Sequence, residues 1–272
     1  MSDEIDSLRD RVAVVVGGAS GIGRATVALL ARRGAHVVVA DADHRGAAEL
    51  AAAFDEHVQA VEVDVRDEQS VTAMAQSARE TYGGIDLLVN CAAATGLDTI
   101  ARDVDLIGMA LEAWQTSIDV NLSGSMLACR ACLPLMIDRG GGAIVNMVSV
   151  GALAGNLGLT AYAASKGGLV ALTRSIATQY GHLGIRCNAI AAGFVRTPST
   201  TANLTDTMAE IVRRNTLVGF LGEADDVARV ILFLLSSDSR YITGEVIRVD
   251  GGQLAHTPTY DALRAAASGP TR

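Results

Sequence analysis

Tyr162 and Lys166 are the residues of this sequence best placed to do acid–base chemistry. They lie four positions apart in a stretch with helical periodicity, so both side chains fall on one face of the helix. An ammonium group beside a phenol favours the phenolate, and the pair therefore predicts a lowered tyrosine pKa and a general acid or base. Taken alone, the same spacing also fits an ordinary amphipathic helix.

Two more polar residues support a catalytic interpretation of this pair. Ser149 ends a predicted strand just upstream of Tyr162, where its hydroxyl could polarise a substrate oxygen. Asn121 stands in an otherwise apolar helical stretch, where a buried asparagine can equally be structural. The predicted catalytic set is therefore Asn121, Ser149, Tyr162 and Lys166.

A glycine-rich turn near the start of the chain predicts a phosphate-binding site. A valine-rich strand runs into this turn, and a helix follows it. Glycines let the backbone approach a pyrophosphate closely, while the N–H groups at the start of the helix bind its charge. The spacing G-x-x-x-G-x-G differs from the G-x-G-x-x-G fingerprint, and an ordinary tight turn is the alternative. The residues assigned to this site are Gly17, Ser20, Gly21, Ile22 and Gly23.

Asp41, at the end of the second predicted strand, indicates which dinucleotide would bind. A carboxylate at that position accepts hydrogen bonds from an adenosine ribose and repels a 2′-phosphate, so NAD is favoured over NADP. Arg45 could pair with a 2′-phosphate, but it falls inside the following helix, where we expect it to be solvated. Asp64-Val65 and Asn90-Cys91-Ala92-Ala93 close the next two strands, at the edge where open α/β sheets bind ligands.

Strand-length apolar runs alternate with helical segments along most of the chain. This alternation predicts an α/β fold, a doubly wound sandwich with a mostly seven-stranded parallel sheet in a single domain. The predicted strands are 11–17, 35–41, 58–63, 85–90, 143–149, 185–191 and 246–249, and the clearest helices are 21–33, 44–55, 68–81, 161–180 and 224–235.

Composition excludes several classes of protein. With 50% hydrophobic and 19% charged residues, a mean hydropathy of +0.31 and a net charge of −8, the chain is neither disordered nor suited to nucleic acid. The uncharged run between Arg139 and Lys166 is interrupted by glycines and polar residues, so we expect no membrane span there. The first eleven residues lack an apolar run typical of a secretory signal. The four cysteines follow no metal-binding spacing and are expected to be reduced thiols in a cytoplasmic protein.

Taken together, these motifs resemble those of the short-chain dehydrogenase/reductase family, from about residue 11 to residue 252. The resemblance implies a Rossmann-type fold, a nicotinamide cofactor and hydride exchange with a small-molecule alcohol or ketone. It also implies that Tyr162 transfers the proton and that Ser149 orients the substrate oxygen. The matching motifs are Gly17-x-x-x-Gly21-Ile22-Gly23, Asn90-Cys91-Ala92-Ala93, Asn121, Ser149, Tyr162-Ala-Ala-Ser-Lys166 and Val249-Asp250-Gly251-Gly252.

The same resemblance implies roles for the remaining site residues. Lys166 would hold the nicotinamide ribose and lower the tyrosine pKa, and Asn121 would anchor a water of the proton relay. Contacts with the rest of the cofactor would come from Asp64 and Val65 at the adenine, Asn90 and Ala92 on the ribose side, and Val195 and Thr197 at the carboxamide.

The chain departs from the family pattern at Val16, Cys91, Ala93 and Ala192. The family usually has threonine and asparagine at the first two positions, and their side chains bond to each other between adjacent strands. Losing both partners of a buried hydrogen bond can be nearly neutral, whereas losing one costs ~1–3 kcal/mol. We therefore expect Val16 and Cys91 to form a compensated pair and Val16→Thr alone to destabilise the protein.

The expected division of the chain is an N-terminal extension (1–10), the Rossmann-type domain (11–252) and a C-terminal tail (253–272). Within the domain, 198–222 is the least regular segment and is expected to be a mobile substrate flap. Segment 98–113 either overhangs the site or decorates the surface. The expected pocket walls are mostly aliphatic and suit an apolar or alicyclic substrate; they are Ala94, Thr95, Val150, Leu153, Asn156, Phe194, Met208, Ile211 and Leu217.

Two other functions stay open. One is an NADPH-dependent 3-oxoacyl-thioester reductase, and the other is a non-catalytic NAD(H)-binding sensor on the same fold. Family members are commonly homotetramers or homodimers joined through two long helices, here about 114–139 and 161–180. Alanines such as Ala161, Ala164 and Ala171 would allow close approach of these helices.

Overall fold

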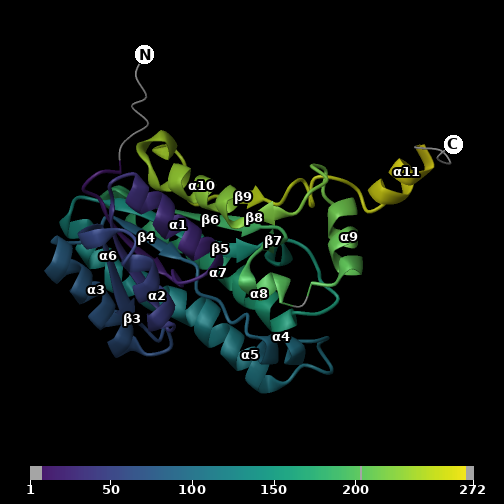
Figure 1. The fold of residues 1–272 in the computed structure, drawn as a ribbon, viewed down its shortest axis with the longest axis horizontal. Helices are drawn as coiled ribbons and strands as arrows, with labels where there is room; N and C mark the ends of the chain where they lie inside the picture. Colours follow the sequence, from purple (N-terminus) through teal and green to yellow (C-terminus); the bar gives the residue numbers. More distant parts are fainter. Residues whose placement is uncertain (1–7, 203, 268–272) are drawn as a thin grey trace, which may run out of the picture.

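Seven parallel strands form the centre of the computed structural model, which describes residues 8–202 and 204–267 (Figure 1). The predicted 1–10 extension and 253–272 tail therefore lie partly outside the described residues. The strand order β3-β2-β1-β4-β5-β6-β9 changes direction between β1 and β4, which opens a crevice at the carboxyl ends of these strands. The strands are β1 (Val12–Val16), β2 (His36–Asp41), β3 (Val58–Glu62), β4 (Leu87–Asn90), β5 (Gly142–Ser149), β6 (Ile185–Ala192) and β9 (Val246–Val249).

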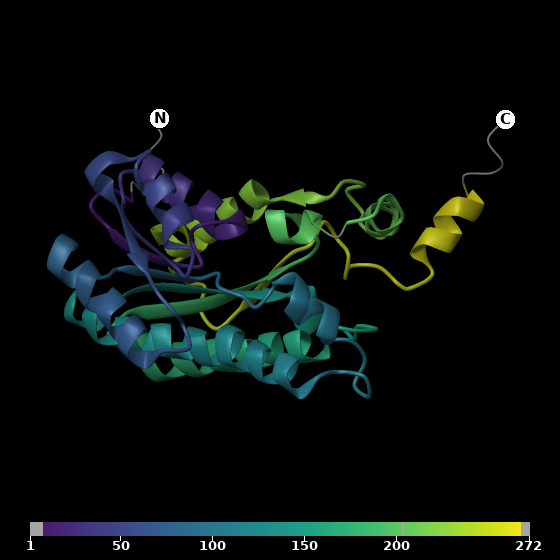
Figure 2. The ribbon, with the colours of Figure 1, turned by 60° about the horizontal axis from the view of Figure 1, so that its bottom comes forward.

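Helices cover both faces of the sheet, as Figure 2 shows. One face carries α1 and α10, with α2 beside them; the other carries α3, the α5–α6 run and α7. The predicted α/β fold with a seven-stranded parallel sheet is confirmed. The helices are α1 (Gly21–Arg32), α2 (His44–Ala51), α3 (Glu68–Tyr82), α5 (Leu111–Ser117), α6 (Gly124–Asp138), α7 (Thr160–Tyr180) and α10 (Ala224–Leu235).

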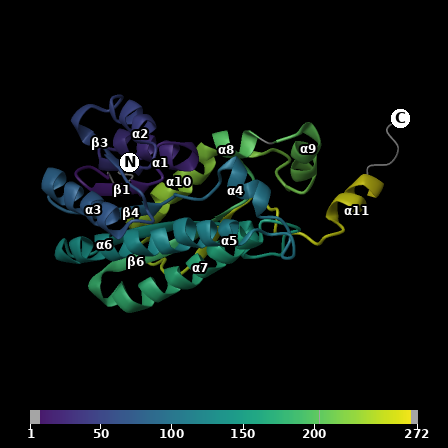
Figure 3. The same ribbon diagram turned by 90° about the horizontal axis from the view of Figure 1, so that it is seen from below.

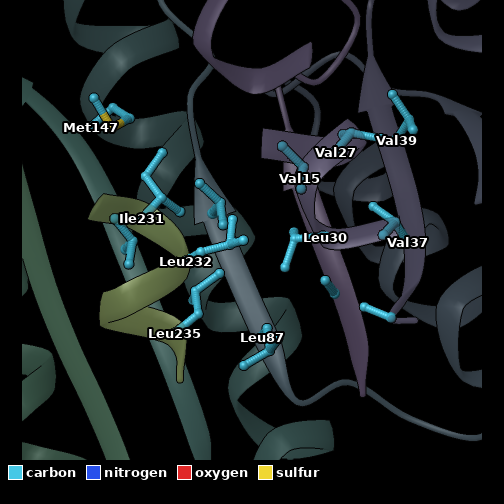
Figure 4. Packing of buried hydrophobic residues seen from close by; sticks show 14 of the residues in the cluster. Val15, Val27, Leu30, Val37, Val39, Leu87, Met147, Ile231, Leu232 and Leu235 are labelled. Atoms are coloured by element: carbon cyan, nitrogen blue, oxygen red, sulfur yellow. The ribbon is translucent and has the colours of Figure 1, made fainter. Parts of the chain in front are cut away.

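The central strands are buried on both sides, which explains their continuous apolar sequence. Every residue of β1 is buried, and its side chains alternate between two hydrophobic clusters. Val15 packs with Leu30 of α1 and Ile231 of α10 in one cluster (Figure 4). Val14 packs with Met136 of α6 in the cluster on the opposite face. The two clusters fix the positions of the strand ends that carry the polar residues.

Segment 198–222 is more regular than the sequence predicts. It contains α8 (Pro198–Thr201) and α9 (Asp206–Arg214), and a short parallel pair, β7 (Val195–Arg196) with β8 (Gly222–Glu223), flanks them. Thr197 and Thr205 begin the two helices, since each side chain accepts a hydrogen bond from a backbone N–H three residues later. Thr205 inside the segment and Thr197 just before it are therefore helix caps, and the role of the segment as a mobile substrate flap stays a prediction.

Segment 98–113 packs against the start of α7. It forms α4 (Leu97–Arg102), a turn and the beginning of α5, and Asp103 bonds to residues at the start of α7. The long helix predicted after it is interrupted by a π-helical turn, η2 (Ile118–Ser123). Helix α11 (Tyr260–Ala267) projects away from the sheet and its helices (Figure 3). Short 3-10 turns complete the described structure: η1 (Asp55–His57), η3 (Val150–Ala152), η4 (Gly181–Leu183) and η5 (Ser237–Ser239).

Among the described residues, one helical run, Leu111–Asp138, is long and apolar enough to cross a membrane by length and composition alone. This is weak evidence, because the core helices of soluble proteins pass the same test. In this structure the run contributes Ala128, Cys132 and Met136 to the hydrophobic cluster on the face of the sheet that α3, α6 and α7 cover.

Candidate active site

A cleft of about 450 Å³ lies at the carboxyl ends of the central strands. Most of the residues predicted for the site line it, although they come from seven separate stretches of the chain. Asn90 and Asn121 are the two exceptions, and their neighbours Cys91 and Val120 line the cleft instead. The predicted residues in the lining are Gly17, Ser20, Gly21, Ile22, Gly23, Asp41, Asp64, Val65, Ala92, Ser149, Tyr162, Lys166, Val195 and Thr197.

The glycine turn is shaped by backbone contacts that leave no room for side chains. Gly17 has φ +79°, and a Cβ there would overlap the backbone of Ala92. A Cβ at Gly23 would overlap the carbonyl oxygen of Gly17. The side chain of Ser20, at the start of α1, makes no capping hydrogen bond. The turn thus presents the N-terminus of α1 to the cleft, an arrangement that fits the pyrophosphate of a dinucleotide.

Asp41 is held in place at the rim of this turn. Its carboxylate accepts hydrogen bonds from the backbone N–H of Ala19 at 2.9 Å and of Asp43 at 3.0 Å. Arg45 lies outside the lining: its side chain is 89% exposed and pairs with Glu49 on the surface of α2. The expectation of a solvated Arg45 is confirmed, and the negative charge of Asp41 faces the cleft without it.

Arg66 is a lining residue that the sequence interpretation missed. Its guanidinium makes two hydrogen bonds to Asp64, at 2.9 and 2.7 Å, beside the buried Val65. The side-chain hydrogen bond from Arg66, with a further bond from its backbone N–H, lowers the pKa of Asp64. The adjacency of Asp64, Val65 and Arg66 after a strand was the available signal for a planar ion pair at this end of the cleft.

Ser149, Tyr162 and Lys166 meet at the other end of the cleft. Ser149 ends β5, its hydroxyl hydrogen-bonds to Tyr162, and its oxygen also accepts the N–H of Gly151 at 3.1 Å. Tyr162 stands in the first turn of α7 and Lys166 one turn later. The Lys166 ammonium donates to the carbonyl of Met147 at 2.8 Å and lies 5.6 Å from the centre of the Tyr162 ring.

Burial dominates the protonation of this pair. Lys166 is 2% exposed, and loss of hydration lowers its pKa to about 8. Burial also raises the pKa of Tyr162, while the hydrogen bond with Ser149 opposes the rise. The sequence predicted a lowered tyrosine pKa, and the structure gives the opposite direction. The physical reason is that burial destabilises the phenolate more than the neighbouring Lys166 ammonium stabilises it. The ammonium donates its hydrogen bond to the Met147 carbonyl instead of to the phenol.

Asn121 is fully buried and connects two elements of the site. Its Oδ1 accepts the N–H of Ala94 at 2.7 Å, and its Nδ2 donates to Ser165 Oγ at 2.9 Å. It lies in the π-helical turn η2, between α5 and α6. These contacts tie the end of β4 to α7, and a role in anchoring a water stays a prediction.

The side chain of Asn90 points into the core rather than toward the cleft. Its Nδ2 donates to Asn146 Oδ1 at 2.8 Å, and Asn146 in turn donates to Thr173 at 2.9 Å. Asn90 Oδ1 is buried and has no hydrogen-bond partner among the described residues. Asn90 therefore does not face the ribose side with its amide, whereas Ala92 does line the cleft.

Val16 and Cys91 do not form the compensated pair that the sequence suggested. Val16 is in register with Asn90, so those two side chains share one face of the sheet. Cys91 follows Asn90 in the chain and packs in the hydrophobic cluster of the opposite face. Because the two side chains lie on opposite faces of the sheet, they do not replace the two partners of the hydrogen bond that is typical of the family. Val16 instead shares its face of the sheet with Asn90, whose Oδ1 has no hydrogen-bond partner among the described residues.

The site combines an open helix N-terminus and the Asp41 carboxylate with a Ser-Tyr-Lys group. These features define a dinucleotide-binding α/β fold with an acid–base centre. Residues 17–253 match the family model described as enoyl-(acyl carrier protein) reductase. The chain belongs to the short-chain dehydrogenase/reductase family, whose members are oxidoreductases that bind a nicotinamide dinucleotide.

Three relatives illustrate the breadth of this similarity. A probable short-chain type dehydrogenase/reductase from Bradyrhizobium diazoefficiens is 46% identical over 92% of this chain and 89% of its own length. The 7alpha-hydroxysteroid dehydrogenase of Bacteroides fragilis is 34% identical over 95% of this chain and 100% of its length. The 3-oxoacyl-[acyl-carrier-protein] reductase FabG of Thermotoga maritima is 38% identical over 90% of this chain and 98% of its length.

Solved structures share the whole fold. A crystal structure described as ribose-5-phosphate isomerase from Brucella melitensis 16M superposes with a TM-score of 0.87 at 34% identity, covering 98% of each chain. The crystal structure of gox2181 gives a TM-score of 0.86 at 32% identity, covering 92% of this chain and 98% of that one.

Proposed function

We propose that this protein is an NAD(H)-dependent oxidoreductase that interconverts a secondary alcohol and a ketone on an apolar or alicyclic substrate. The observation that carries the proposal is one cleft with Asp41 and the open α1 N-terminus at one end and Ser149, Tyr162 and Lys166 at the other. The Ser-Tyr-Lys group is complete, with no member replaced.

The side chains supply the proton chemistry of this reaction. In ketone reduction the Tyr162 hydroxyl donates its proton to the substrate oxygen, while Ser149 hydrogen-bonds to the same oxygen. The raised pKa keeps Tyr162 protonated at neutral pH, which suits the acid role. Lys166, charged below a pKa of about 8, supplies a buried positive charge beside the developing phenolate. A nicotinamide ring bound in the cleft would deliver or accept the hydride.

Exposed apolar side chains beyond the cleft favour an apolar substrate. They lie on three segments that continue directly from cleft-lining residues: the chain after Thr95, the chain after Ser149, and the flap after Thr197. The 7alpha-hydroxysteroid dehydrogenase among the relatives supports an alicyclic alcohol. The exposed residues are Leu97, Leu106, Ile107, Leu111, Leu153, Leu157, Met208, Ile211, Leu217, Val218 and Phe220.

Turnover of a panel of cyclic secondary alcohols with NAD, followed by nicotinamide absorbance, tests this function. Tyr162→Phe should bind NADH with unchanged affinity and lose turnover by about 10²–10⁴-fold. Tyr180→Phe, at the opposite end of α7, is the matched control and should keep full activity. Retained activity in Tyr162→Phe would overturn the mechanism. Tight NADH binding without turnover on the whole panel would instead support the non-catalytic sensor.

The proposed preference for NAD over NADP rests on Asp41. Asp41→Ala should relax the preference for NAD by about ten-fold or more in the ratio of the two dissociation constants, because the repulsion of a 2′-phosphate is lost. Asp43→Asn, two residues away at the start of α2, is the control and should leave the ratio unchanged. An Asp41→Ala protein with an unchanged ratio would favour the NADPH-dependent 3-oxoacyl-thioester reductase, the alternative that the FabG relative supports.

We further propose a cytoplasmic homotetramer or homodimer joined through Leu111–Asp138 and α7. Support comes from the apolar character of that run and from the exposed Ala164 and Ala171 on α7; Ala161, which the sequence placed on the same contact, is buried inside the chain. All four cysteines are free thiols, which suits a reducing compartment. Ala171→Arg should shift the sedimentation coefficient toward a smaller species, and an unchanged value would contradict this interface.

A further inference from the structure

The helix that carries Tyr162 begins without a cap of its own. Leu159 occupies the cap position of α7 with a left-handed backbone (φ 58°, ψ 43°), and its side chain has no oxygen to offer the free N–H groups. Those groups are satisfied from a distant part of the chain. Asp103 Oδ1 accepts the N–H of Ala161 at 2.9 Å, and Asp103 Oδ2 accepts the N–H of Tyr162 at 2.9 Å.

Backbone contacts beside this carboxylate reinforce the connection. The carbonyl of Asp103 accepts the N–H of Leu159 at 2.8 Å, and the carbonyl of Val104 accepts the Thr160 hydroxyl at 3.2 Å. Residues 103–104, which we call the clamp, therefore hold every residue from 159 to 162. Helix α4 fixes the clamp in turn, because the N–H of Asp103 donates to carbonyls in its last turn.

Asp103 is placed to control the position of Tyr162, because it is buried against the start of α7 and not on the protein surface. It is 3% exposed, although it ends a short helix in an otherwise exposed segment. Both backbone polar groups of Tyr162 are hydrogen-bonded: its N–H donates to Asp103, and its carbonyl accepts from Ser165 Oγ at 2.7 Å. The position of the phenol against Ser149 thus depends on how firmly the first turn of α7 is held.

We propose that Asp103 is a positioning residue that fixes Tyr162 for proton transfer, a role that rests on the proposed alcohol–ketone chemistry. Its carboxylate binds the backbone of the residue whose side chain meets the substrate. A displacement of about 1 Å in a reacting group can reduce turnover about 100-fold. The clamp also belongs to the segment with exposed Leu106 and Ile107, so it links this apolar surface to the acid–base centre.

The charge of Asp103 gives this role a measurable signature. Within the described part of the chain Asp103 forms no ion pair, so its charge acts on the N-terminus of α7. Within the described residues, the other groups that face the phenol are the Lys166 amine on α7, which is uncharged at the pH where Tyr162 ionises, and the Ser149 hydroxyl at the end of β5. Removing the negative charge while leaving those two in place should make the phenolate easier to form, and the pKa of Tyr162 should fall.

The deciding variant is the isosteric Asp103→Asn, with Asp103→Ala as the larger change. Asp105→Asn is the matched control, since Asp105 lies two residues away, is exposed and bonds only within its own turn, to the N–H of Gly108. For Asp103→Asn we expect turnover about ten-fold lower at an unchanged affinity for NADH. We expect Asp103→Ala to lose more and Asp105→Asn to lose nothing.

A second measurement needs no substrate and separates positioning from folding. Tyrosinate absorbance is titrated in each protein and in the same protein carrying Tyr162→Phe, and the difference reports Tyr162 alone. Asp103→Asn should shift that titration to lower pH. If the folded Asn variant loses thermal stability but keeps both the wild-type turnover and the wild-type titration, Asp103 is only a structural cap and the proposal is wrong. If Tyr162→Phe keeps its turnover, the proposed function fails instead, and the titration still reports on the clamp.

Discussion

The two ends of the cleft are built in different ways. The cofactor end depends mainly on backbone shape, with Gly23 packed against Gly17 inside one short turn and Gly17 packed against the backbone of Ala92. The catalytic end depends on side chains that reach across the fold, such as Asp103 to Tyr162 and Asn121 to Ser165. A local motif can specify the first end, whereas the second exists only once distant segments have packed together.

The largest loss of cofactor affinity is expected from a change at the cofactor end, where one added methyl group should be enough to distort the glycine turn. Gly23→Ala places a Cβ against the Gly17 carbonyl oxygen, so the turn must open and the helix N-terminus must move. We expect affinity for NADH to fall at least about 100-fold, a loss of about 3 kcal/mol, measured by calorimetry. Gly181→Ala, where a Cβ meets nothing within 4 Å, is the control. Unchanged affinity in Gly23→Ala would show that the turn is not rigid.

At the catalytic end, Lys166→Met should separate stability from activity. Folding lowers the pKa of Lys166 from 10.5 to about 8, so burying its charge costs roughly 3 kcal/mol of stability, which the methionine variant regains. The variant also loses the hydrogen bond from Lys166 to the Met147 carbonyl, which reduces this gain by about 1 kcal/mol. We therefore expect Lys166→Met to unfold at a higher denaturant concentration, by about 2 kcal/mol, and to lose turnover. A destabilised variant would mean that Lys166 is better solvated than its burial indicates.

The pH dependence sharpens the same contrast, because it reports on Tyr162 and Lys166 at the catalytic end. Tyr162 stays protonated at neutral pH, so reduction should be fast there, while oxidation, which needs the phenolate, should rise with pH. Lys166 carries its charge below a pKa of about 8 and loses it above. Lys166 is the only lysine in the chain, so selective ¹³C labelling of lysine gives one NMR signal whose titration measures this pKa directly. A midpoint near 10.5 would contradict the buried environment.

The smallest effect concerns Val16, where the structure reverses the sign expected from the sequence. Val16 is in register with Asn90, so a threonine hydroxyl at this position would share a face of the sheet with the unpartnered Asn90 Oδ1 and could donate to it. We expect Val16→Thr to stabilise the protein by about 1 kcal/mol in urea unfolding. Val14→Thr, opposite Leu88 in the same strands, offers no acceptor and should destabilise. If Val16→Thr and Val14→Thr lower the free energy of unfolding equally, the original expectation that Val16→Thr destabilises the protein would be correct.

Sequence reasoning succeeded where the signal was local. The valine-rich strands, the glycine turn and Asp41 each follow from a few neighbouring residues, and all lie where they were predicted. It failed where partners are distant. Asp103 gave no signal of its own, although the missing cap at Leu159 could have prompted a search for one. The direction of the Tyr162 pKa was wrong because spacing shows the nearby ammonium but not the depth of burial.

The sequence by itself predicted the alternation of strands and helices, the glycine turn at the start of α1 and the polar residues that meet in the cleft. These depend on periodicity, backbone conformation and side-chain chemistry, all of which are properties of short segments. The tertiary structure alone decided which groups are desolvated, which face of the sheet each side chain occupies, and which carboxylate holds the catalytic helix. Those properties arise from packing between segments as far apart as Asp103 and Tyr162, and no local pattern encodes them.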